Sequence, residues 1–262
     1  MRALATAATG MMAQELNVQV ISNNIANMRT TGYKRQSAEF QDLLYEHVRR
    51  IGTQTSTQGN ILPVGIDLGG GVKTVGTPRL MTQGTMSPTG ADLDVAVRGE
   101  GFFKILMPDG TYAYTRDGSF QMDNQGRIVT AAGNVVQPSV TIPSNAQSIT
   151  INSQGQVSVT VPGTTTPTIL GQIALTRFIN KAGLQAVGDN MFVETPASGS
   201  PQDGVPQTDG YGDVQQGNLE QANVEAVSEI SDLIGAQRAY EMNAKVITAA
   251  DQMLQATSSL SR

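Results

Sequence analysis

Residues 4–28 read LATAATGMMAQELNVQVISNNIANM, and this stretch decides how the chain begins to fold. Apolar side chains in it recur with a three–four alternation over four heptads, with Gln14 as the one polar interruption. The two positions of the repeat are held by Leu4, Met11, Val18 and Ile25, and by Ala7, Gln14, Ile21 and Met28. The repeat, together with the absence of Pro, predicts a long helix with an apolar stripe.

The C-terminal segment, residues 224–260, carries two adjacent apolar seams. One seam comprises Ala239, Met242, Val246, Ala249, Met253, Ala256 and Leu260, and the other Tyr240, Asn243, Ile247, Ala250, Leu254 and Thr257. Two seams side by side make a wide stripe that can touch more than one neighbour. The spacing alone is equally consistent with an antiparallel helix pair inside one chain and with a helical bundle between subunits.

The residues between the two helical ends are rich in Gly, Thr and Val. Short apolar–polar alternations, such as residues 93–98, predict strands, and turn signals such as Pro108-Asp109-Gly110 separate them. We therefore predict an α+β protein whose N- and C-terminal helices form a coiled coil, with an inserted all-β domain that is sandwich- or barrel-like. The predicted domains are residues 1–32 plus 224–262 for the coiled coil, 33–71 for a linker with an extended loop or hairpin, and 72–223 for the β-rich domain.

Finer features of the chain are also predicted. A further short helix is expected within residues 36–50, around Phe40 and Leu43, and an extended loop or hairpin at residues 46–71. The β part is expected to divide into two lobes near residues 138–143. Phe102 and Phe103 are adjacent in a strand and face opposite ways, so one is expected in a core and the other under a neighbouring domain.

Composition excludes several classes of function. The chain has 262 residues with 28 Gly, six Phe, six Tyr and neither Trp nor Cys, and its formal net charge is −5. Between residues 101 and 225 there are ten Asp or Glu against five Lys or Arg, which argues against a nucleic-acid surface. Without Cys there are no disulfides and no thiolate metal sites. Polar residues interrupt the N-terminal segment, so neither a cleavable secretory signal nor a transmembrane span is expected.

The sequence contains no catalytic constellation, and no cofactor or metal site is expected. His47 is the only His and lies among charged residues, which is typical of a surface position. Asp92 and Asp94 share one face of a strand, where paired carboxylates could bind a cation or transfer protons, but strand edges carry such pairs routinely. The Asp-rich turns at 117–118 and 123–126 lack the ligand order of a calcium loop and are better explained as hairpin turns.

Three runs of local sequence, at both ends and in the middle, carry a family resemblance. The N-terminal run includes Asn23, Asn24, Ala26, Asn27, Gly32, Tyr33 and Lys34. The others are VRGEGFF at residues 97–103 with YTRDGSF at 114–120, and QRAYEMN at 237–243 with DQML at 251–254. These runs resemble, in the expected order, the N-terminal signature, the central β domain and the C-terminal helix of the bacterial flagellar rod and hook family. The similarity covers nearly the whole chain.

Within that family, the chain is most similar to distal rod subunits, because hook subunits are usually much longer. The runs at 43–46, 57–59, 62–63 and 69–72 resemble a stretch that distinguishes distal rod from hook. Residues assigned to this rod-specific loop are Gly52, Gln58, Leu62 and Pro63.

The resemblance implies a structural subunit that is not an enzyme. It implies export without a cleaved signal peptide through the type III apparatus, followed by polymerisation into a rigid hollow helical driveshaft that carries motor torque across the periplasm to the hook. The implied partners are further copies of the chain, proximal rod proteins, the hook protein, the P and L ring proteins, peptidoglycan and the export apparatus. Neither nucleic acid nor direct membrane insertion is expected. An intersubunit coiled coil is expected to use Leu4, Met11, Val18, Ile21, Ile25, Met242, Val246, Ile247, Met253 and Leu254.

Other interpretations stay open at this point. A proximal rod or hook-type axial subunit shares the helical ends, and a secreted β-rich adhesin is a candidate from a different class. A hydrolytic or carbohydrate-active β enzyme would need paired acids in a pocket with aromatic side chains, and the chain has no Trp.

Overall fold

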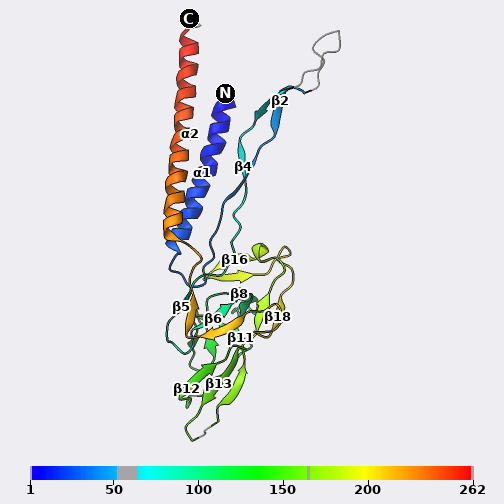
Figure 1. Ribbon diagram of the computed structural model, residues 1–262, viewed down its shortest axis with the longest axis vertical. Helices are drawn as coiled ribbons and strands as arrows, with labels where there is room; N and C mark the ends of the chain where they lie inside the picture. The colour runs from blue at the N-terminus through cyan, green and yellow to red at the C-terminus, as the bar shows by residue number, and fades with distance from the viewer. Residues whose placement is uncertain (1, 52–63, 164–165, 261–262) are drawn as a thin grey trace. The chain divides into compact units, whose positions relative to one another are not determined.

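The computed structural model describes residues 2–51, 64–163 and 166–260. It divides into two compact units. The helical unit comprises residues 1–25, 36–78 and 225–262, and the β unit comprises residues 26–35 and 79–224. The predicted α+β class, with a helix at each end and an inserted β-rich part, is confirmed (Figure 1).

Two long helices dominate the helical unit. Helix α1 spans Arg2–Ala26 and helix α2 spans Ala226–Leu260. They lie side by side and run in opposite directions (Figure 1). Asn24, near the end of α1, donates from Nδ2 to Glu229 Oε2 in the first turn of α2 at 3.1 Å. Further along, Gly10 of α1 faces Asn243 of α2 so closely that an added Cβ would lie 3.0 Å from Asn243 Nδ2. Small side chains therefore let the helices approach each other.

Two antiparallel ribbons complete the helical unit. Strand β1 (Glu39–Asp42) pairs with β4 (Val72–Gly76), and β2 (Tyr45–Arg49) pairs with β3 (Ile66–Gly69). The expected short helix within residues 36–50 is therefore wrong, whereas the hairpin expected at 46–71 is present in the described part of that range. Phe40 and Leu43 gave a helical spacing over barely one turn, which is too short to nucleate a helix, and pairing with β4 supplies the backbone hydrogen bonds instead.

The β unit is built on a nine-stranded antiparallel sheet of order β16-β17-β8-β7-β11-β10-β9, which β15 joins by pairing with β7 and β18. Its strands are β7 Phe102–Leu106, β8 Tyr112–Thr115, β9 Gln121–Met122, β10 Ile128–Val129, β11 Val135–Gln137, β15 Leu175–Arg177, β16 Gln185–Gly188, β17 Met191–Val193 and β18 Gln202–Gly204. The smaller sheets are formed by β12 Ser148–Ile151, β13 Gln156–Thr160 and β14 Thr168–Gln172, by β6 Val95–Arg98 with β19 Asp213–Gln216, and by β5 Met86–Pro88 with β20 Asn218–Glu220. A short 3-10 helix, η1, covers Lys181–Gly183.

One apolar core runs through the β unit. It contains Phe103 and Ile105 of β7 together with Ile151, Val157 and Val159 of the three-stranded sheet. The expected division into two lobes near residues 138–143 is therefore wrong, because Val140 and Ile142 from that stretch are buried in the same core.

The paired phenylalanines also differ from expectation. Phe103 lies in the main core, where its ring meets Phe120 edge-on at 5.0 Å between centroids. Phe102 lies on the opposite face of β7 and belongs to a second buried cluster with Phe178 and Phe192, not beneath another domain. Both faces of β7 are thus covered by apolar side chains within one unit.

Candidate functional sites: the signature segment and the terminal helices

The signature segment, residues 26–35, is an integral part of the β unit. Gly32 adopts a left-handed conformation with φ +67°, and an added Cβ would lie 2.6 Å from the backbone nitrogen of Asp117. Only Gly fits this position without strain. The Gly32 N–H donates to the Glu220 carbonyl at 2.8 Å, and the Asn190 side chain donates to the Thr31 carbonyl at 2.8 Å. The Tyr33 side chain that follows is buried.

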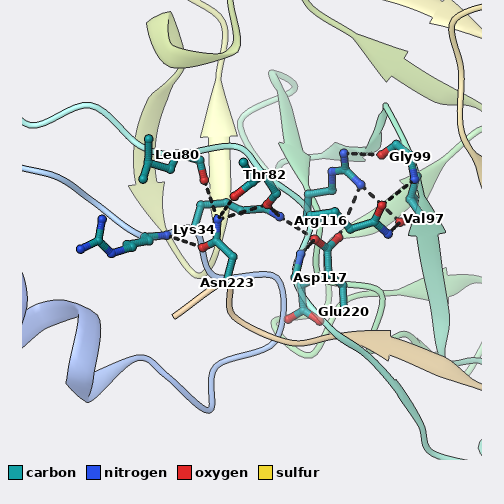
Figure 2. Close-up of polar contacts among 12 residues, drawn as sticks. Lys34, Leu80, Thr82, Val97, Gly99, Arg116, Asp117, Glu220 and Asn223 are labelled. Carbon is teal, nitrogen blue, oxygen red and sulfur yellow. Dashed lines mark hydrogen bonds and ion pairs between the residues drawn. The ribbon is translucent and has the colours of Figure 1, made fainter. Parts of the chain in front are cut away.

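Lys34 enters a buried ionic cluster around Glu220 of β20 (Figure 2). Its Nζ donates to Glu220 Oε1 at 2.5 Å and to the Thr82 carbonyl at 2.8 Å. Arg116 reaches the other carboxylate oxygen, with Nη1 3.4 Å from Glu220 Oε2. The Gly84 N–H also donates to Glu220 Oε1 at 2.8 Å. One carboxylate therefore compensates two buried cations.

Burial shapes the electrostatics of this cluster. It lowers the pKa of the Lys34 ammonium, and the nearby Glu220 carboxylate opposes that shift. Burial likewise lowers the pKa of the Arg116 guanidinium against the attraction of Glu220. Arg116 is also held by the carbonyls of Val97 and Gly99, at 3.3 and 2.7 Å, and its guanidinium lies over the Phe102 ring, 5.2 Å from the centroid. Both cations thus have several acceptors, but Glu220 is their shared counterion.

Asn223 joins further chain segments in the same region of the β unit. Its Oδ1 accepts the Arg35 N–H at 2.7 Å. Its Nδ2 donates to the Leu80 carbonyl and to Thr82 Oγ1, each at 2.8 Å (Figure 2). A single side chain therefore binds together three chain segments, at residues 35, 80–82 and 223.

Asn24 likewise joins separate chain segments by side-chain hydrogen bonds inside the helical unit. Its side chain is fully buried and exchanges two hydrogen bonds of 2.9 Å with the backbone of Gln36, in addition to its contact with Glu229. Among the other signature residues, Asn23 and Ala26 are exposed and Asn27 is half-buried with Oδ1 accepting from Thr30 Oγ1. The buried members of the signature therefore stabilise each unit internally, Asn24 in the helical unit and Gly32, Tyr33 and Lys34 in the β unit.

The residues expected to form an intersubunit coiled coil divide into two groups. Ile21 is buried and Leu4, Met11, Val18, Ile25 and Ile247 are half-buried. Met242, Val246, Met253 and Leu254 are exposed, at 61%, 47%, 64% and 45% of their accessible surface. The face of α2 that packs within the chain carries Glu229, Ala236, Asn243 and Ala250 at heptad spacing. Asn243 and Ala250 belong to the second predicted seam, whereas Glu229 and Ala236 lie outside both seams.

An apolar surface also remains on the hairpin of the helical unit. Every residue of β2 and β3 is exposed, including Tyr45, Val48, Ile66 and Leu68. A groove lined in part by Leu68 and Val246 connects this hairpin with α2. The rod-specific residues Gly52, Gln58, Leu62 and Pro63 lie outside the described residues.

The residues that the sequence offered as candidates for catalysis or metal binding take part in contacts within strands and turns. His47 Nδ1 lies 2.6 Å from Asp67 Oδ1 across the exposed β2–β3 ribbon. The backbone of Asp94 pairs with that of Ser119 in an isolated antiparallel β-bridge. Asp123 accepts from the N–H groups of Gln125 and Arg127, as the predicted hairpin turn between β9 and β10 requires.

Within residues 2–51, 64–163 and 166–260, no three His, Asp or Glu side chains are grouped so that they could hold a metal ion. Over the same residues, neither helix is long and apolar enough to cross a membrane.

Three family models match consecutive parts of this architecture. Residues 4–34 match the flagella basal body rod protein model, residues 96–159 the D1 domain of the flagellar hook protein FlgE/F/G, and residues 215–260 the C-terminal part of the flagellar basal body rod FlgEFG protein. A flagellar basal-body rod protein FlgG from Caulobacter vibrioides is 55% identical over 260 residues, which are 99% of each chain. The chain belongs to the FlgG family of flagellar basal-body rod proteins.

More distant FlgG proteins also match along the whole chain. The FlgG of Agrobacterium fabrum is 50% identical over 97% of both chains, and that of Bacillus subtilis is 36% identical over the full length of both. Relatives of this family are named as rod proteins rather than as enzymes. The chain is accordingly a structural subunit of the flagellar basal-body rod, which associates with copies of itself and with other rod and hook proteins.

Proposed function

We propose that this subunit of the flagellar distal rod polymerises through its terminal helices into a rigid, hollow, helical driveshaft that carries torque from the motor across the periplasm to the hook. The observation that supports the proposal is the apolar face left exposed on α2, formed by Met242, Val246, Met253 and Leu254. Together with Leu4, Met11, Val18 and Ile25 of α1, these residues are the proposed intersubunit surface.

The free energy gained by burying that face in a polymer can be compared with the cost of association. Complete burial of one Met, Val or Leu side chain contributes about 1.5–3 kcal/mol. Association opposes this with about 4–15 kcal/mol of lost translational and rotational freedom, and the ordering of each flexible side chain adds about 0.5–1.5 kcal/mol. The four side chains together contribute at most about 6–12 kcal/mol, which is similar in size to that cost. A stable contact therefore also needs the apolar residues of α1 or contacts with more than one neighbouring subunit.

The exposed β2–β3 hairpin is proposed to pack between adjacent subunits and to limit bending. A two-stranded ribbon is only marginally stable in water on its own, so its apolar side chains gain from a neighbour. Substituting Ser for Tyr45, Val48 and Leu68 should give curved or short polymers. The matched control substitutes Ser for Ile169 and Ile179, which are exposed apolar residues of the β unit. Straight, full-length rods from the hairpin variant would contradict this role.

The remaining partners follow from the same proposal. The subunit would be exported by the type III apparatus without a cleaved signal, join proximal rod proteins below and hook protein above, and turn inside the P and L rings and peptidoglycan. The acidic β unit would face those surroundings, where its charge keeps the rotating surface hydrated.

Immunogold labelling of isolated basal bodies with hooks attached tests the proposal. Label confined to the straight segment directly below the hook, outside the inner membrane, is the expected result. Label on the curved hook would assign the chain to the hook instead, and label on the inner end of the rod would assign it to the proximal part. Absence from the whole structure would contradict a rod function.

A further inference from the structure

The Glu220 carboxylate is a buried group at which separate segments of the β unit meet. Its side chain has no exposed surface, and it accepts from Lys34, Gly84 and Arg116. These contacts come from three separate segments of the chain. In the part of the chain that the structure describes, Glu220 is the one carboxylate paired with Lys34 or with Arg116.

The order of these residues along the chain is as informative as their geometry. Glu220 follows Lys34 by 186 residues and Arg116 by 104. Most strands of the β unit, including the core strands β7 and β8, precede it. A chain that lacks Glu220 in place must bury two cations whose remaining hydrogen-bond acceptors are the carbonyls of Thr82, Val97 and Gly99, with the Glu100 carboxylate acting only at longer range. Removing one partner of a buried ion pair is strongly destabilising, because it leaves an uncompensated charge in a medium of low dielectric constant.

We propose that Glu220 is a late counterion that keeps the β unit from completing its fold until nearly the entire chain is present. The cations that need it come earlier in the chain, one in the signature segment and one directly after β8, whereas the anion lies in the last strand of the unit. This inference concerns the folding of one subunit and goes beyond the proposed assembly. If the type III export proposed above passes the chain unfolded, the device also delays folding until most of the chain has passed, and that consequence rests on the proposed function.

Hydrogen exchange on the full-length monomer, with matched substitutions, tests the inference. Glu220→Gln removes the buried charge while it preserves the shape of the side chain. Asp203→Asn is the control, because Asp203 also pairs with a lysine, Lys104 at 2.7 Å, but is nearly half exposed. In strands β6, β7 and β8, the slowest amides of Glu220→Gln should exchange at least about 100-fold faster than those of the wild type. The Asp203→Asn control should change them by less than about 10-fold. Equal protection in Glu220→Gln and the wild type would overturn the proposal.

A second variant decides the case in which Glu220→Gln does not fold. Adding Lys34→Met removes one of the two buried cations, so the double variant should recover at least about 10-fold in protection over Glu220→Gln alone. No recovery would show that unbalanced charge is not the cause, and would also overturn the proposal.

Pulsed hydrogen exchange during refolding of the wild type tests the order of events. The Gly84 amide reports on Glu220 directly, because it donates to the carboxylate. Amides of β7 and β8 should become protected in the same kinetic phase as Gly84. Full protection of those strands in an earlier phase would overturn the proposal. All of these readouts use monomeric protein, so their outcome is independent of whether the subunit forms a rod.

Discussion

Substitution of Gly32 by Ala should destabilise the β unit far more than substitution of Gly110, which also has a positive φ. Gly32 has φ +67°, and its Cβ would meet Asp117 N at 2.6 Å and Arg116 C at 2.8 Å. Gly110 has φ +83°, and its Cβ would meet nothing within 4 Å. The pair therefore separates the conformational cost of a left-handed residue from the cost of overlap with neighbouring backbone.

The magnitudes follow from these two costs. A left-handed Ala costs roughly 1 kcal/mol more than Gly, and this applies to both positions. At Gly32 the backbone of Asp117 must also shift, and overpacking of this kind costs about 1–3 kcal/mol. The free energy of unfolding of the β unit should thus fall by about 2–4 kcal/mol in Gly32→Ala and by about 1 kcal/mol in Gly110→Ala. The entropy gained by restricting the unfolded chain is the same for both variants and cancels in the comparison.

Thermal unfolding followed by far-UV circular dichroism and by hydrogen exchange of the β-unit strands is a suitable assay. For a unit of this size, 1 kcal/mol shifts Tm by about 2–4 °C. Gly32→Ala should therefore lower Tm by roughly 5–15 °C, and Gly110→Ala by only about 2–4 °C. Equal shifts in the two variants would refute the reasoning that the signature glycine is required by close packing against Asp117.

Three further predictions concern other parts of the subunit. Met242→Glu should leave the monomer's unfolding free energy within about 0.5 kcal/mol of the wild type but abolish polymer formation in a sedimentation assay, and a normal polymer would exclude this face from the interface. Phe102→Leu should lower the unfolding free energy by about 1–3 kcal/mol in urea titrations, because edge-on ring contacts in the second cluster are lost, and a change below about 0.5 kcal/mol would argue against them. Although desolvation raises the pKa of Asp203, hydrogen bonds from Lys104 and Thr176 outweigh it and hold that pKa below its ordinary value of 3.8. The stability that this carboxylate contributes is present above the unfolded pKa and is lost as pH falls through the folded pKa, so Asp203→Asn should flatten acid unfolding curves in that range.

The sequence carries strong information where one pattern repeats over a long stretch. The alternation from Leu4 to Ile25 extends over several turns, so it specified helix α1 without tertiary information. At residues 36–50 the apolar spacing was short, and pairing of β1 with β4 prevailed over it. On α2 the first predicted seam is largely exposed, whereas the face toward α1 includes Asn243 and Ala250 of the second seam. That face also includes Glu229, a charged residue that no hydrophobic periodicity could identify.

The buried ionic cluster was beyond prediction from one sequence for a different reason. Lys34, Arg116 and Glu220 are far apart in the chain and belong to no common periodic pattern. Charged side chains are normally exposed, so each one by itself favoured a surface position. Lys34 could be singled out only through its place in the signature, and that resemblance said nothing about what it contacts.

The exposed face of α2 supports the central claim that this subunit assembles through its terminal helices, and a thiol placed on that face tests the claim most directly. Because the chain has no Cys, Met242→Cys or Met253→Cys introduces a single thiol at a position that is 61% or 64% exposed in the monomer. A maleimide reagent should label either variant readily as a monomer, and labelling should be at least about 10-fold slower in isolated rods and return when the rods are dissociated. Labelling in intact rods at the monomer rate would contradict the claim.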